Sequence, residues 1–135
     1  MVWKFTIGQN RVKKHLTYLL ENSQVPHAQL FTSVSGYGNL SLSIDFALQL
    51  LTGADSSNAE KTLSQSCQHP NLHFIYPVVK RGSEKSVFSS DYINEWYHFL
   101  DHSPYGNYSD WYDAIEVGNK QGIIAVSEIE KLHKS

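Results

Sequence analysis

The sequence predicts an α/β fold, in which parallel strands are covered by helices, and two observations carry that prediction. Residues 28–34, AQLFTSV, form a short apolar run that leads through a glycine-containing turn into residues 39–51. The apolar side chains of 39–51 surround most of a helix, which is typical of a buried helix. Residues 71–79, NLHFIYPVV, read as a second strand. Strand, glycine turn and buried helix are the first half of a βαβ unit, so we expect a parallel sheet with flanking helices.

The first element is a helix over residues 9–22. Its apolar side chains recur at helical spacing on one face: Val12, Leu16, Leu19 and Leu20. Pro26 follows the helix and restricts Val25 to extended geometry. The chain therefore turns after the helix and enters the strand at 28–34.

The second half of the chain is predicted to be mostly helical. Residues 89–102 and 110–117 carry aromatic and aliphatic side chains at helical spacing, and Pro77 ends the strand that precedes them. A last helix covers residues 125–135, with an apolar face built from Val126, Ile129 and Leu132. This helix has no glycine cap, so we expect the chain to be cut inside or just after it.

Composition narrows the function classes. The 135 residues are 41% hydrophobic and 18% charged, with a net charge of -2, so no overall basic field indicates nucleic-acid binding. No apolar run reaches the length of a membrane span, and the N-terminus lacks the apolar core of a signal peptide. The single cysteine, Cys67, excludes a disulfide framework. We expect a cytoplasmic protein.

Residues 33–40, SVSGYGNL, occupy the place of a phosphate-binding P-loop between the first strand and its helix. The P-loop pattern requires a first glycine, a second glycine, a lysine and then a serine or threonine. Those positions hold Ser33, Gly38, Asn39 and Leu40, so only the second glycine is retained, and Gly36 adds another inside the loop. Asn39 has no charge for a phosphate and Leu40 cannot bind Mg²⁺. The loop is either a degenerate phosphate loop or an ordinary turn in which Asn39 caps the helix.

The residues around this loop resemble bacterial clamp-loader subunits of DNA polymerase III, which are AAA+ proteins of the delta-prime and gamma/tau types. The resemblance covers about residues 5–78 and 120–132. It is carried by Ile7-Gly8-Gln9, Pro26-His27-Ala28, Leu30-Phe31, His69-Pro70-Asn71-Leu72 and residues 122–132, GIIAVSEIEKL. Asn71 replaces the family's aspartate and Glu130 its arginine. The resemblance implies that residues 1–135 are the N-terminal part of a P-loop-type AAA+ domain, with a small, mostly helical, aromatic-rich insertion at about 80–118.

The departures from the family pattern indicate which type of subunit to expect. In this family, gamma-type subunits hydrolyse ATP with an intact P-loop, whereas delta-prime subunits often have a degraded loop and act as a rigid scaffold. The resemblance therefore implies a delta-prime-like scaffold for sliding-clamp loading in DNA replication. Such a subunit belongs to the DNA-directed DNA polymerase holoenzyme, and we expect neither ATPase activity nor bound ATP in this chain. The implied partners are other clamp-loader subunits in a hetero-oligomer and, through them, the sliding clamp and primed DNA.

Two alternatives stay open. One is an active gamma/tau-type ATP-hydrolysing motor, and the other is a small aromatic-rich interaction module unrelated to replication. The aromatic residues of 80–118, next to Lys80, Arg81 and Lys85, are arranged either to stack on single-stranded DNA or to form a small core between two short helices.

Metal binding is not expected. The family usually has a four-cysteine zinc module before the His-Pro strand, but this chain has only Cys67 and, two residues on, His69. Structural zinc requires four ligands, so we expect no zinc and a plain thiol at Cys67. His98 and His102 have the spacing of a helical metal pair, yet no HExxH pattern accompanies them, and we expect two exposed histidines at a helix end.

Overall fold

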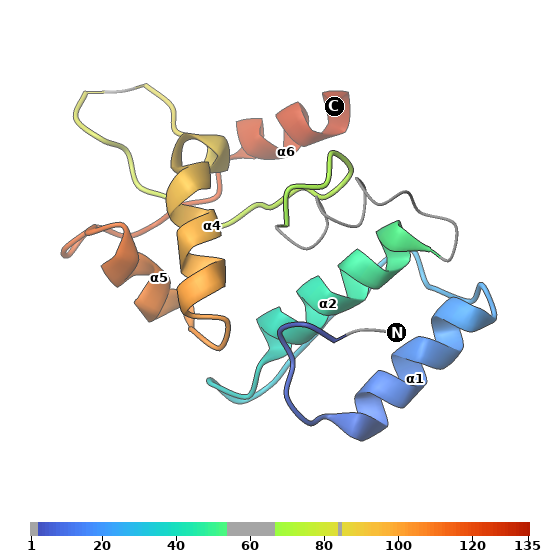
Figure 1. Ribbon diagram of the computed structural model, residues 1–135. Coiled ribbons are helices and arrows are strands. Elements are labelled where there is room, and N and C mark those ends of the chain that lie inside the picture. The colour runs from blue at the N-terminus through green and yellow to red at the C-terminus, as the bar shows by residue number, and fades with distance from the viewer. Residues whose placement is uncertain (1–2, 54–66, 84) are drawn as a thin grey trace. The chain divides into compact units, whose positions relative to one another are not determined.

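The computed structural model describes residues 3–53, 67–83 and 85–135 (Figure 1). The chain divides into two compact units, Met1–Asn71 and Leu72–Ser135, which are called unit 1 and unit 2. Unit 1 holds helices α1 (Asn10–Glu21) and α2 (Asn39–Thr52). Unit 2 holds the 3₁₀ helix η1 (Ser89–Tyr92) and helices α4 (Ile93–His102), α5 (Tyr108–Ala114) and α6 (Val126–Lys134).

The predicted α/β fold is wrong for the part of the chain that the structure describes, because that part contains helices and no β-strand. Its single β-type pairing is an isolated antiparallel bridge between Val78 and Ile123. The Val78 N–H donates to the Ile123 carbonyl at 3.0 Å, and the Ile123 N–H donates back at 2.9 Å. The parallel sheet expected from the sequence is therefore not formed by these residues.

The apolar side chains of the two segments predicted to be strands do not face a sheet. In 28–34, Leu30 is 88% exposed, so the run is not the buried strand that its composition suggested. Phe31 instead packs against Phe46, with ring centroids 6.1 Å apart. In 71–79, only Val78 forms a bridge, and Tyr76 is buried against aromatic rings. An apolar run makes a strand only where neighbouring backbone groups complete the hydrogen-bond ladder, and these runs lack such neighbours among the described residues.

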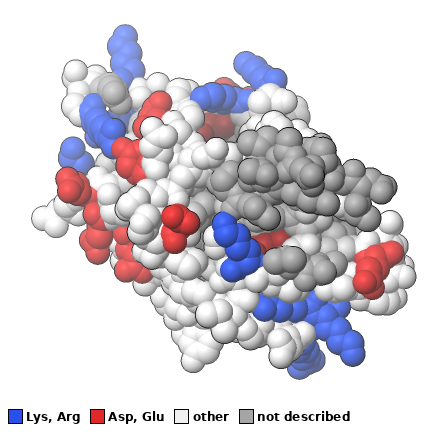
Figure 2. Space-filling model, in the orientation of Figure 1, with Lys and Arg blue, Asp and Glu red and all other residues white. Residues whose placement is uncertain are grey.

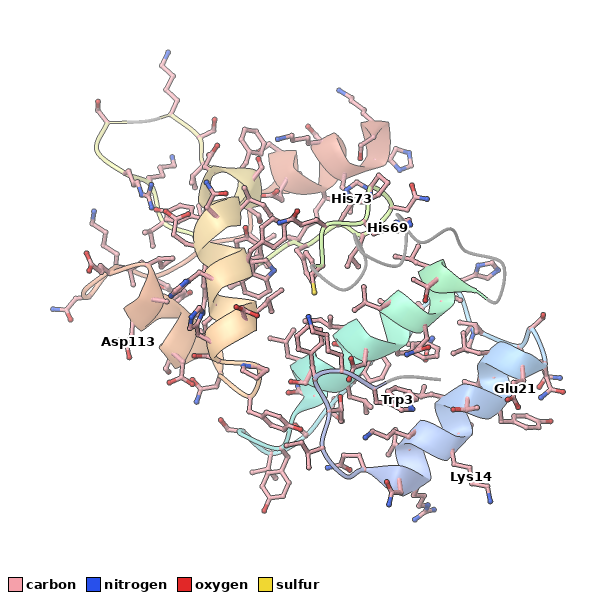
Figure 3. All side chains as sticks on the ribbon, viewed as in Figure 1. Trp3, Lys14, Glu21, His69, His73 and Asp113 are labelled. Atoms are coloured by element: carbon pink, nitrogen blue, oxygen red, sulfur yellow. The ribbon has the colours of Figure 1, made fainter. Side chains whose placement is uncertain are left out.

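The helices of unit 1 confirm the predictions for residues 9–22 and 39–51 to within one residue at each end. Leu16 from α1 packs with Leu42 and Phe46 from α2 to form the centre of a small core. Partly buried side chains complete it: Trp3, Leu19, Leu20, Val25 and Phe31. Figure 3 labels Trp3, which reaches this core from the segment that precedes α1. The core thus joins α1, α2 and both segments that flank α1.

Asp45 holds the N-terminal segment of unit 1 onto α2. It is the only acidic or basic residue of α2 and is 1% exposed. Its carboxylate accepts hydrogen bonds from the backbone N–H groups of Lys4 (3.0 Å), Phe5 (3.0 Å) and Thr6 (2.8 Å), and from the Thr6 hydroxyl (2.7 Å). Carboxylates are rarely buried unless they are fully hydrogen-bonded. These four donors meet that requirement and fix the path of residues 4–6.

The core of unit 2 is a cluster of aromatic rings. Trp96 from α4 stacks on Tyr76 with ring centroids 4.1 Å apart and meets Trp111 from α5 edge-on at 5.0 Å. Phe74 and Phe99 extend the cluster at centroid distances of 5.7 and 5.6 Å from Trp96. Aromatic pairs in these offset and T-shaped arrangements stabilise a fold beyond the area that they bury. Two short helices and one extended segment are thereby joined into one unit.

Three buried polar groups of this core donate to backbone carbonyls. The Tyr76 hydroxyl donates to Ser89 (2.6 Å), the Tyr92 hydroxyl to Val79 (2.7 Å) and the Trp111 indole N–H to Pro77 (2.8 Å). These bonds tie the extended segment 76–79 to η1 and α5. The indole N–H of Trp96 is buried and finds no acceptor among the described residues. An unsatisfied donor of this kind costs about 1–3 kcal/mol, which the ring contacts of Trp96 must offset.

Candidate functional site

The predicted phosphate loop is a turn built on two left-handed glycines. Gly36 has φ 83° and Gly38 has φ 86°, a region in which side chains other than glycine are strained. The Tyr37 N–H donates to the Val34 carbonyl at 3.2 Å and closes the turn. Gly38 is the N-cap of α2 and Asn39 its first residue, so Asn39 does not cap the helix as the ordinary-turn interpretation expected.

A cleft of about 230 Å³ lies beside this loop. It is lined by the start of α1, the segment before the loop, the loop itself and α2: Gln9, Val12, Leu30, Phe31, Thr32, Ser33, Tyr37, Gly38, Asn39 and Leu42. The structure therefore brings Ser33, Gly38 and Asn39 together around one cleft. Gly36 and Leu40 are not part of its lining.

The lining of this cleft contains no acidic or basic side chain. A bound nucleoside triphosphate needs a cation on its β and γ phosphates and a hydroxyl on its Mg²⁺. Asn39, at the lysine position, is exposed and neutral, and Leu40, at the hydroxyl position, is half-buried. Lys13 of α1 donates instead to the Thr6 carbonyl at 2.7 Å. What remains is the dipole of α2 and its first backbone N–H groups, which attract anions only weakly.

The largest buried aromatic residues of 80–118 belong to the core of unit 2. Trp96, Phe99 and Trp111 are buried, as the small-core interpretation predicts, whereas Tyr108 is 66% exposed. Two of the three basic residues beside them have partners. The Lys80 ammonium donates to the Lys85 carbonyl at 2.8 Å, and the Arg81 guanidinium bonds the Glu95 carboxylate at 3.0 Å. Figure 2 shows acidic and basic side chains interspersed on the visible face. The buried rings are therefore not available to stack on bases.

The candidate metal residues lie in ordinary structural settings. Cys67 is buried and forms no disulfide, and the His69 Nδ1 accepts a hydrogen bond from the Asn71 N–H at 3.1 Å. His98 and His102 are exposed at the end of α4, as predicted, with their rings stacked 3.9 Å apart. Within residues 3–53, 67–83 and 85–135, no three His, Cys, Asp or Glu side chains come together as a metal-binding group.

Helix α6 forms where it was predicted, but the burial of its faces differs from the prediction. Val126, Ile129 and Leu132 are 77%, 53% and 39% exposed, whereas Glu128 is 6% exposed. The Glu128 carboxylate accepts a hydrogen bond from the Ser89 N–H at 2.7 Å, which explains why the acidic side of α6 faces the unit. The apolar spacing that we used to orient the helix gave no sign of this bond.

Glu128 lies close enough to the aromatic core to affect it. Burial raises the pKa of the Tyr76 hydroxyl well above its usual value, and the negative charge of Glu128 raises it further. Tyr76 keeps its proton and donates it to the Ser89 carbonyl. Glu128 also lines a groove of unit 2 that the sequence interpretation missed. Asp45 is flanked by Ile44 and Phe46 in a helical stretch, and that pattern was the available signal for it, whereas Glu128 lies between Ser127 and Ile129 and has no such signal.

No helix among the described residues is both long enough and apolar enough to cross a membrane. A scan against protein-family models, a search of curated proteins and a search of solved structures each find no match to this chain.

Proposed function

We propose that this chain is a catalytically silent, delta-prime-like subunit of a bacterial clamp loader, acting in the cytoplasm. In this proposal it contributes binding surface to a hetero-oligomer that loads the sliding clamp onto primed DNA. The polymerase holoenzyme to which it belongs carries the nucleotidyl-transfer activity, and this chain hydrolyses no ATP. The parallel sheet is not part of the proposal, which rests on the sequence motifs and on the loop.

The observation that carries the silent role is the uncharged cleft beside the loop. The second glycine of a phosphate-binding loop is present as Gly38 at the start of α2, and Ser33 replaces the first. The groups that bind phosphate and Mg²⁺ are replaced by Asn39 and Leu40, and no acidic or basic side chain lines the cleft. The same observation argues against the ATP-hydrolysing motor.

The replication role is supported by motifs on either side of the loop. Ile7-Gly8-Gln9 leads into α1, and Gln9 lines the cleft together with Leu30 and Phe31. Two of the stretches that resemble clamp-loader subunits therefore contribute residues to one site in unit 1.

Two measurements test the proposal. In calorimetric titration, we expect no heat of binding for ATP with Mg²⁺ at millimolar nucleotide. Micromolar, Mg²⁺-dependent binding would make the motor the better explanation. In size-exclusion chromatography, the chain should co-elute with gamma/tau-type and delta-type subunits from the same organism. Separate elution at micromolar protein would favour the interaction module unrelated to replication.

A paired variant sharpens the nucleotide test. Asn39→Lys combined with Leu40→Thr restores the charge and the hydroxyl at the start of α2. Because Gly38 and the start of α2 are already in place, we expect this double variant to gain measurable affinity for ATP while keeping its partners. Asn39→Gln with Leu40→Val, which restores neither group, is the matched control.

A further inference from the structure

A groove of about 250 Å³ opens on unit 2 between the extended segment 72–75, the start of α4, and α6. Its apolar lining is formed by Leu72, Phe74, Ile75, Ile93, Tyr97 and Leu132. Its polar lining is formed by His73, Ser90, Lys131, Ser135 and one acidic residue, Glu128. The groove is smaller than the pockets that hold drug-sized ligands, so it has room for a single long side chain.

Glu128 is the acidic group of this groove. Its side chain is 6% exposed, and its Oε2 atom accepts the Ser89 N–H at 2.7 Å. That is the one hydrogen bond that the Glu128 carboxylate accepts within the described residues. A carboxylate can accept about four hydrogen bonds, and a buried carboxylate is costly unless it is paired.

The cationic side chain nearest in sequence does not pair with Glu128. Lys131, one turn further along α6, donates to the Ser90 hydroxyl at 2.9 Å. Its ammonium lies over the Phe88 ring, 4.7 Å from the ring centroid. Lys131 thus lines the same groove as Glu128 without pairing with it, and no ion pair to Glu128 forms among the described residues.

We propose that this groove binds the side chain of an arginine presented by a partner protein. The aliphatic stem of an arginine fits against Leu72, Ile93 and Leu132, and its guanidinium meets the Glu128 carboxylate. Guanidinium groups are weakly hydrated and offer several N–H donors in a planar fork, which suits a mostly buried carboxylate better than ammonium does. An anionic side chain would be repelled by Glu128, and a neutral one would leave the carboxylate unpaired. The inference does not depend on the clamp-loader proposal.

The test uses butylguanidinium as a probe for an arginine side chain and butylurea as its neutral counterpart. Both are titrated into the ¹⁵N-labelled full chain, and the Ser89 amide resonance is followed because this N–H bonds Glu128. We expect saturable shifts with butylguanidinium at millimolar concentration and an affinity at least tenfold lower for butylurea. Equal affinity for the two probes would overturn the proposal.

Variants of α6 locate the binding. Glu128→Gln keeps an acceptor for the Ser89 N–H but removes the charge, and we expect it to weaken butylguanidinium binding at least tenfold. Glu130→Gln, at an exposed position of the same helix, should leave the affinity unchanged. Lys131→Met removes a nearby positive charge and should tighten binding severalfold. If Glu128→Gln does not fold, Lys131→Met decides, because unchanged or weaker binding in that variant contradicts a site built on Glu128.

Discussion

Replacing Asp45 with alanine should destabilise unit 1 more than any surface change can. The substitution removes the acceptor for four donors on residues 4–6. Lys4 is exposed and Phe5 is half-buried, so water can replace the bonds that their N–H groups lose. Thr6 is only 4% exposed, and both its N–H and its hydroxyl would be left unpaired. At about 1–3 kcal/mol for each buried donor, the expected loss in free energy of unfolding is about 4 kcal/mol.

Hydrogen exchange of the Thr6 amide, measured by NMR, is the most direct assay. The exchange rate of this amide reports on the stability of unit 1 alone, whereas a global denaturation curve contains contributions from both units. We expect exchange at Thr6 to speed up by about three orders of magnitude in Asp45→Ala, since each 1.4 kcal/mol is a factor of ten. Urea unfolding followed by circular dichroism should show the same loss as an earlier first transition.

Glu21→Ala is the matched control. Glu21 is an exposed acidic residue at the end of α1 (Figure 3), and we expect its removal to change stability by about 0.5 kcal/mol or less. The reasoning would be refuted if the Thr6 amide exchanged at the same rate in Asp45→Ala as in the unaltered chain. That outcome would mean that core packing alone positions residues 4–6.

The remaining predictions concern unit 2. Burial raises the pKa of the Tyr76 hydroxyl, so the unfolded chain loses this proton before the folded chain does as the pH rises above about 10. The free energy of unfolding should therefore fall above this pH. Tyr76→Phe should reduce that fall when the free energy of unfolding is measured against pH. Trp111→Phe removes the bond to the Pro77 carbonyl and part of a ring that is 2% exposed, and should cost about 2 kcal/mol in urea unfolding. The hydrogen bond from Arg81 lowers the pKa of Glu95. This ion pair stabilises the fold above the ordinary glutamate pKa, and its stabilisation is lost as the pH falls and Glu95 takes up a proton. Because both side chains are exposed, Glu95→Gln should lower the free energy of unfolding by at most about 1 kcal/mol, and by less in high salt.

The helices could be predicted from sequence because their signals are local. The apolar spacing of Leu16, Leu19 and Leu20 and the apolar residues around Phe46 identify α1 and α2 without knowledge of any partner. Packing then confirms them, because Leu16 and Phe46 meet in one core. The glycine turn before α2 was likewise readable, since Gly36 and Gly38 adopt backbone angles that favour glycine.

The sheet and the polar contacts could not be predicted in this way, because they depend on residues far apart in the chain. The apolar runs at 28–34 and 71–79 are compatible with strands, but a strand requires a neighbour, and sequence periodicity does not show whether one exists. The burial of Glu128 depends on one N–H of Ser89, 39 residues earlier. Of the candidate site, the loop residues were identified from sequence, whereas the groove with Glu128 was not.

The pairing of Trp96 and Trp111 has an optical consequence. Their rings lie 5.0 Å apart with planes at 88°, close enough for the excited states of the two indoles to couple. Coupled indoles in a skewed arrangement add their own bands to circular dichroism in the region used to measure helix. Ellipticity of this protein will therefore misstate its helix content, and the difference between the unaltered chain and Trp111→Phe isolates the indole contribution. The same bands give a spectroscopic reading of contact between α4 and α5, without any label.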